Sequence, residues 1–89
     1  MDVSGIDNES PYLVSNETVG DFLHLKVADD GLGIDYDKIY AETLSGTVIK
    51  PYSIKKSTGE IIFEIPDESM NIYIPDVKEN TLQLVITIT

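Results

Sequence analysis

The segment Val27–Asp35, VADDGLGID, is the point around which the strand pattern of this 89-residue chain is organised. It starts as an apolar strand and runs into a turn that holds three carboxylates and two glycines. Aspartate and glycine are common in turns because aspartate bonds its own backbone and glycine tolerates unusual dihedral angles. Before this turn, apolar and polar side chains alternate over Asp21–Ala28, the period-two pattern of a half-buried β-strand.

The same alternation recurs along the rest of the chain, without a convincing helix. Ser45-Gly46 separates two apolar–polar runs and predicts a hairpin, and Pro51 indicates that its strand lies at a sheet edge. About seven short strands at this spacing predict an all-β fold, an immunoglobulin-like β-sandwich of antiparallel strands. A partly open barrel is the alternative architecture. The expected strands cover residues 11–15, 21–28, 37–44, 47–55, 60–66, 71–75 and 81–88.

Length and composition fit one domain with one core. Residues 1–10 are polar and weakly patterned, which predicts a linker or flexible arm, and residues 11–89 form the domain. The chain has no cysteine, so disulfides, thiolate metal sites and cysteine nucleophiles are excluded.

Along each expected strand, alternate side chains point to opposite faces, so the residues divide into a set that faces the core and a set that faces outward. The predicted core consists of Leu23, Leu25, Val27, Ile39, Ile61, Phe63, Ile65, Ile72, Ile74, Leu82, Leu84 and Ile86. An exposed patch for a neighbouring domain or partner is predicted at Phe22, Tyr40, Ile62, Tyr73 and Val85.

The charge balance disfavours nucleic acids and anionic membrane surfaces as partners. The formal net charge is −10, from 16 acidic and 6 basic residues. Nucleic-acid binding needs a basic face that displaces counterions, and anionic membrane surfaces also attract basic segments. No apolar run approaches the roughly 20 residues that cross a bilayer, so membrane insertion is not expected.

Acidic residues gather in two loops that a sandwich of this strand order places at the same end. The candidate ligands are Asp29, Asp30 and Asp35 in the first loop and Asp76 in the second, together with the amide oxygen of Asn80. Calcium takes about six to eight oxygen ligands from such side chains, so a calcium site is predicted here, with no other cofactor. The spacing does not match an EF-hand loop, and turn formation alone is the alternative explanation.

Catalytic chemistry is not expected. His24 is the only histidine, and it has the solvent-facing parity of its strand. One imidazole without cysteines makes a poor zinc site, and no serine stands in a nucleophile-elbow sequence. The sequence therefore predicts a protein that is not an enzyme.

Several short motifs between Leu23 and Ile88 resemble those of bacterial immunoglobulin-like modules (Big-type, fibronectin-III-like) of exported proteins. The matching elements are Val27 with Asp29, Gly33–Asp35, Ile39 through Gly46, Gly59–Phe63, and Ile72 with Asp76 and Asn80. The chain departs from that pattern in its last turn, where a glycine usually precedes the asparagine and this chain has Glu79.

The resemblance implies a non-catalytic spacer or adhesion module of a bacterial secreted or cell-surface protein, located outside the cell beside neighbouring domains. A carbohydrate- or ligand-binding accessory domain of a secreted hydrolase is the alternative. Such a domain would bind a glycan or protein through the acidic loop end or through exposed Tyr36, Tyr40 or Tyr52.

Overall fold

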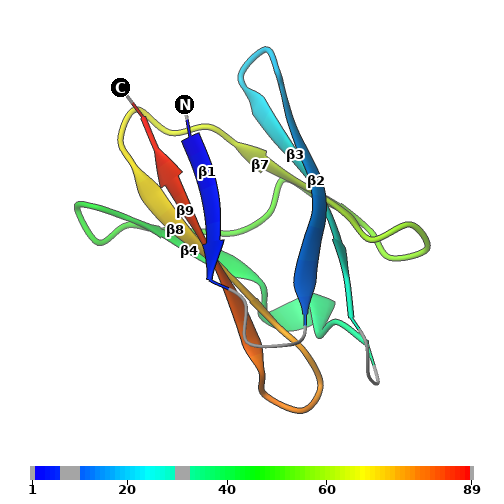
Figure 1. Cartoon of the computed structure of the whole chain (residues 1–89). Helices are drawn as coiled ribbons and strands as arrows, with labels where there is room; N and C mark the ends of the chain where they lie inside the picture. The colour runs from blue at the N-terminus through cyan, green and yellow to red at the C-terminus, as the bar shows by residue number, and fades with distance from the viewer. Residues whose placement is uncertain (1, 7–10, 30–32, 89) are drawn as a thin grey trace.

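The computed structural model describes residues 2–6, 11–29 and 33–88. In these ranges the chain forms two antiparallel β-sheets that face each other, which confirms the all-β sandwich (Figure 1). The five-stranded sheet has the order β1-β9-β8-β4-β5 and the four-stranded sheet the order β2-β3-β7-β6. The strands are β1 (Asp2–Ile6), β2 (Tyr12–Val19), β3 (Phe22–Ala28), β4 (Tyr40–Thr43), β5 (Val48–Ile49), β6 (Ser53–Lys55), β7 (Glu60–Glu64), β8 (Met70–Pro75) and β9 (Thr81–Thr87).

The linker predicted over residues 1–10 is wrong for Asp2–Ile6, which form β1. This strand pairs antiparallel with β9, from Asp2 opposite Thr87 to Ile6 opposite Gln83. The pairing covers an edge of β9 whose backbone groups would otherwise lack partners, and this tertiary gain outweighs the weak strand propensity of the segment. Residues 1 and 7–10 of the predicted arm lie outside the described residues.

The strand predicted over residues 47–55 is divided into two. β5 pairs with β4, whereas β6 pairs with β7 in the other sheet. Pro51 stands between them, and because proline has no N–H it cannot continue a ladder. Both β5 and β6 are edge strands, as the proline predicts. The Ser45-Gly46 hairpin is confirmed by the pairing of β4 with β5.

Two other strands differ from prediction by three or more residues at one end. The strand expected from residue 37 begins at Tyr40, because the short 3₁₀-helix η1 (Tyr36–Lys38) precedes it. Its turn is closed by the Lys38 N–H, which donates to the Asp35 carbonyl at 3.1 Å. The first predicted strand extends to Val19 and shifts register between Leu13 and Ser15, as at a β-bulge.

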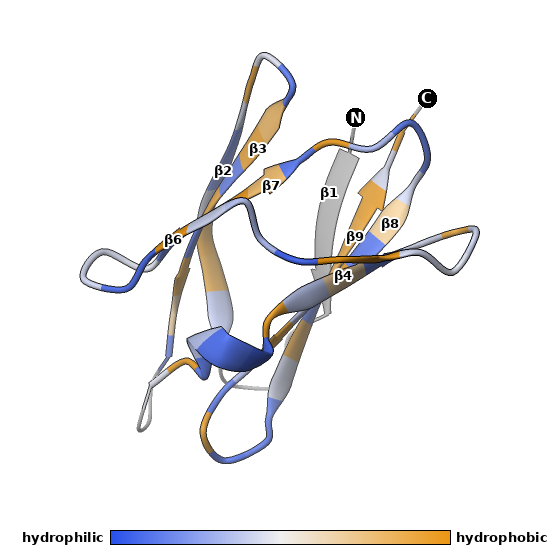
Figure 2. Cartoon of the chain, turned by 180° about the vertical axis from the view of Figure 1, so that it is seen from behind, coloured by the Kyte–Doolittle hydropathy of each residue, from blue (hydrophilic) through white to orange (hydrophobic). Residues whose placement is uncertain are grey.

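The core lies between the sheets. Every predicted core residue is buried except Ile65, which is half-buried and packs against the cluster from just beyond the end of β7. Ile34, Ala41 and Met70 are buried there too. Ala41 and Met70 follow the inward parity of β4 and β8, whereas Ile34 lies in a loop outside the expected strands. Figure 2 shows hydrophobic residues concentrated on β3, β7 and β9.

The two ends of the sandwich hold different parts of the chain. β9 runs from Thr81, beside the turn after β8, to Thr87, which is paired with Asp2. The two ends of the described chain therefore emerge together, and the acidic loops lie at the opposite end of the molecule (Figure 1).

Candidate functional site

The two predicted acidic loops meet through their backbones. Ile34 forms an isolated antiparallel bridge with Asp76. The Asp35 N–H donates to the Pro75 carbonyl at 2.9 Å, and the Val77 N–H donates to the Gly33 carbonyl at 3.1 Å. The loop after β3 and the turn between β8 and β9 thus form one acidic loop end, defined here as the described residues 29, 33–38 and 75–81.

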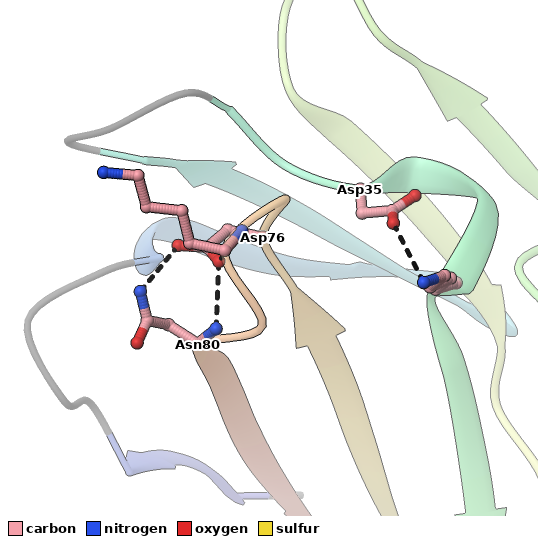
Figure 3. A network of polar contacts seen from close by, with 5 residues as sticks. Asp35, Asp76 and Asn80 are labelled. Atoms are coloured by element: carbon pink, nitrogen blue, oxygen red, sulfur yellow. Dashed lines mark hydrogen bonds and ion pairs between the residues drawn. The ribbon is translucent and has the colours of Figure 1, made fainter.

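Asp76 is the centre of the second turn. Its side chain is only 4% exposed. One carboxylate oxygen, Oδ1, accepts from the backbone N–H groups of Lys78 and Asn80 at 2.8 and 2.9 Å. The other, Oδ2, accepts from Asn80 Nδ2 at 3.1 Å (Figure 3). These bonds fix the turn, so the carboxylate already has partners within its own loop.

The same bonds set the acidity of Asp76. Burial raises its pKa, but hydrogen bonds from the Asn80 side chain and from the backbone of Asn80 and Lys78 lower it more, so the pKa lies below 3.8. The Asp29 side chain makes a further, smaller lowering contribution to the pKa of Asp76.

We expect this depressed pKa to make stability fall in acid. A carboxyl group with a lowered pKa stabilises the fold fully above its ordinary value, and this contribution is lost as the pH falls through the folded-state pKa. Thermal unfolding measured from about pH 7 to about pH 2 should show a decline that begins below about pH 5. Asp76→Asn should melt at a lower temperature at neutral pH and lose less in acid.

Asp37→Asn is the matched control for this prediction, because the Asp37 side chain is 89% exposed and makes only an exposed pair with Lys56 at 3.9 Å. Its melting curve should follow the wild-type pH profile. Equal pH profiles for Asp76→Asn and the wild type would contradict the role given to Asp76.

The remaining predicted ligands do not converge on one point. Asp29 Oδ2 accepts from the Gly33 N–H at 2.8 Å, whereas its Oδ1 is buried and has no hydrogen-bond partner among the described residues. Asp35 faces Lys38 Nζ at 3.7 Å, apart from Asp76 and Asn80 (Figure 3). Asp30 lies outside the described residues.

Calcium binding at this end of the molecule therefore stays a prediction. Within the described ranges, no group of three or more histidine, cysteine, aspartate or glutamate side chains is arranged to hold a metal ion. We expect millimolar calcium to raise the melting temperature through binding linkage, and Asp29→Asn to remove that rise. Asp37→Asn is again the control, and an unchanged melting temperature in wild-type protein would contradict the prediction.

Glu79 occupies the position where the resembling modules have glycine. Its φ is 69°, and its N–H donates to the Asp76 carbonyl at 3.1 Å. The left-handed region costs a residue with a side chain roughly 1–2 kcal/mol, a cost that glycine avoids. Glu79, at which the chain departs from the glycine pattern, is therefore a strained position.

We expect Glu79→Gly to stabilise the protein. Relief of the left-handed conformation should exceed the added entropy of the unfolded chain and give a net gain of about 0.5–1 kcal/mol in urea unfolding. Lys78→Gly, next to it and without a positive φ, should lose stability by the entropy term alone. A loss of stability in Glu79→Gly as large as in Lys78→Gly would disprove the strain.

The predicted aromatic patch is divided between two faces. Tyr40 and Tyr73 are cross-strand partners on the outer side of the five-stranded sheet, with ring centroids 5.0 Å apart. Phe22 lies on the outer side of the other sheet, 4.8 Å from the ring of Tyr52. The patch residues Phe22, Tyr40, Ile62, Tyr73 and Val85 are all half-buried and do not form one surface.

The three tyrosines considered for ligand binding are also apart. Tyr36 packs against the core, and Tyr52 is 69% exposed. Tyr40 has Tyr73 stacked beside it and Lys50 Nζ 5.9 Å from its ring centroid. A shared tyrosine platform is therefore not formed.

A polar network that the sequence did not indicate lies near the end of the sandwich opposite the acidic loop end. The Ser45 N–H donates to Glu68 Oε1, 2.6 Å away, and the Thr43 hydroxyl accepts from the Thr47 N–H at 3.2 Å. The Ser45 backbone hydrogen bond is the main cause of the lowered pKa of Glu68, with smaller contributions from the Thr43 and Ser45 side chains. No local sequence pattern predicts this network, because its residues come from the β4–β5 hairpin and from the β7–β8 loop, which are far apart in the sequence.

Comparisons of the chain with protein-family models, with curated proteins and with solved structures give no match. In the part of the chain that the structure describes, no helix is long and apolar enough to cross a membrane.

Proposed function

We propose that this chain is a non-catalytic, immunoglobulin-like structural and adhesion module of a larger bacterial secreted or cell-surface protein. The strand order supports the fold assignment. In immunoglobulin domains, strands A, B, E and D form one sheet, and C, F and G form the other, with C′ added beside C in variable domains. Here β2-β3-β7-β6 and β9-β8-β4-β5 follow the same two orders.

The position of the chain ends is the observation that carries the adhesion role. β1 is additional to the immunoglobulin order, and it returns the N-terminal segment to the end at which β9 finishes. A spacer that carries tension along its length needs its attachment points at opposite ends. A module attached through Asp2 and Thr87 instead presents its acidic loop end and its sheet faces to the surroundings.

Mechanical unfolding tests this distinction. The chain has no cysteine, so pairs of introduced cysteines give defined handles. Asp2 and Thr87 are register partners, so force applied between them opens β1 from β9 one pair at a time. Force between Tyr12 and Thr87, which lie at opposite ends of the sandwich, loads many strand pairs together.

We expect unfolding with handles at 2 and 87 to begin at a clearly lower force than with handles at 12 and 87. Both cysteine variants should first show the melting temperature of the cysteine-free chain, so that handle effects on folding are excluded. An equal or higher force for the 2 and 87 handles would favour a tension-bearing spacer and overturn the proposal.

A further inference from the structure

The outer face of the four-stranded sheet contains an open hollow of about 180 Å³. Strand register explains why its lining residues face one another. Glu17 is the cross-strand partner of His24, and Lys26 is paired with Ser15 on one side and Glu60 on the other. These lining positions come from β2, β3 and β7, with Leu25 of the buried core also contributing.

The charged groups of this hollow have no ion-pair partner among the residues that the structure describes. The described ion pairs within 4.0 Å are Lys38 with Asp35 and Lys56 with Asp37, both at the acidic loop end. No hydrogen bond to another described residue is made by the side chains that line the hollow, namely Ser15, Glu17, His24, Lys26 and Glu60. Two acceptor carboxylates, one ammonium donor, one imidazole and one hydroxyl are thus free to bind a ligand.

We propose that this hollow binds a neutral saccharide ring, a ligand class that deepens, and rests on, the proposed adhesion function. Each sugar hydroxyl both donates and accepts, so vicinal hydroxyls match a lining that alternates carboxylates with donor groups. The volume is below the range of about 300–1,000 Å³ typical of larger ligands, which fits a single small ring.

An apolar border adjoins the polar lining. Ile62 is the cross-strand partner of His24, and Phe22 lies two residues from His24 on the same face of β3. The exposed ring of Tyr52 lies 4.8 Å from that of Phe22. Aromatic and aliphatic carbons of this kind pack against the C–H faces of a ring whose hydroxyls bond to the lining.

The charge of the hollow favours binding of neutral sugars over anionic sugars. The lining contains two carboxylates and one ammonium, in a chain whose formal net charge is −10. An added carboxylate or phosphate on the ligand would be repelled by this field. The site therefore selects neutral sugars over uronic acids.

Because His24 is the only histidine, its imidazole Cε1–H proton gives a single, self-identifying NMR signal beside the hollow. We titrate the full chain separately with glucose, galactose and N-acetylglucosamine, and with glucuronate as the anionic counterpart. At least one neutral sugar should shift the His24 signal saturably, and glucuronate should bind more weakly than glucose. Glu17→Gln and Glu60→Gln should each weaken binding of that neutral sugar at least about tenfold.

Glu42→Gln is the matched control, because Glu42 is an exposed carboxylate of β4 in the opposite sheet. It should leave sugar binding unchanged, and melting curves should show that all three variants are folded. The proposal is overturned if none of the neutral sugars gives a saturable shift, if the two hollow variants bind like Glu42→Gln, or if glucuronate binds as tightly as glucose. A negative sugar result would leave the mechanical test untouched, so failure of this site and failure of the adhesion module are distinguishable.

Discussion

Gly59→Ala is expected to destabilise the protein by about 3–5 kcal/mol, measured by urea unfolding. Gly59 has a φ of +77°, and a Cβ at this position would collide with the backbone carbonyl of Val27. The two residues are also joined by a hydrogen bond from the Val27 N–H to the Gly59 carbonyl at 3.0 Å. The clash is with backbone, so it is relieved only by moving β3 away from the start of β7.

Gly20→Ala separates the cost of a positive φ from the cost of the clash with the Val27 carbonyl. Gly20 also has a positive φ, +61°, but nothing lies within 4 Å of the position of its Cβ. Its substitution should therefore cost only the conformational part, about 1–2 kcal/mol. Equal losses in the two variants would show that the close approach of Val27 and Gly59 contributes nothing.

Phe63→Ala should cost about 3–5 kcal/mol, because it removes a large, fully buried side chain and leaves a cavity between the sheets. Phe63 is 0% exposed and lies in β7, with Leu23 of β3 as its cross-strand partner. At roughly 4–8 °C for each kcal/mol in a domain of this size, thermal unfolding should detect the change readily.

Phe22→Ala is the matched control, since it removes the same side chain from the outer face of the same sheet. Phe22 is half-buried, with its ring against that of Tyr52. We expect a loss of about 1 kcal/mol or less. A larger loss for Phe22→Ala than for Phe63→Ala would mean that the inner and outer faces have been exchanged.

Strand alternation predicted the fold and most of the core from sequence, because a period of two leaves few ways to bury Leu23, Leu25 and Val27 together. The misses have two causes. Ala41 has the parity of Ile39, and Met70 has that of Ile72, so both follow the alternation and were left out only because the predicted core kept the larger side chains within the expected strands. Ile34 lies in a loop and is buried by its bridge to Asp76, a long-range pairing that no local pattern contains. β1 is a further case, since a weak segment became a strand by covering β9.

The candidate site was predicted in part. Sequence placed the loops of Asp29 and Asp76 at the same end, as the backbone contacts bear out. It did not indicate that Asp76 is already bonded within its own turn, or that Asp35 faces Lys38. Those details depend on side-chain directions within turns. The hollow was missed because its lining comes from three strands whose mutual register is not contained in any local pattern, and the β-bulge in β2 shifts one of the two pairings.

The pairing of β1 with β9 is the central claim, because it brings the chain ends together opposite the acidic loop end. Ser4 and Val85 are register partners, and antiparallel partners lie about 4.5–5.5 Å apart, within the Cα range of a disulfide. Mild oxidation of the Ser4→Cys/Val85→Cys variant should therefore give an intramolecular disulfide, seen by non-reducing electrophoresis and intact mass. The variant Ser4→Cys/Thr81→Cys, which is four residues out of register, should remain reduced. Equal cross-linking in both variants, or in neither, would show a flexible arm in place of β1 and contradict the account.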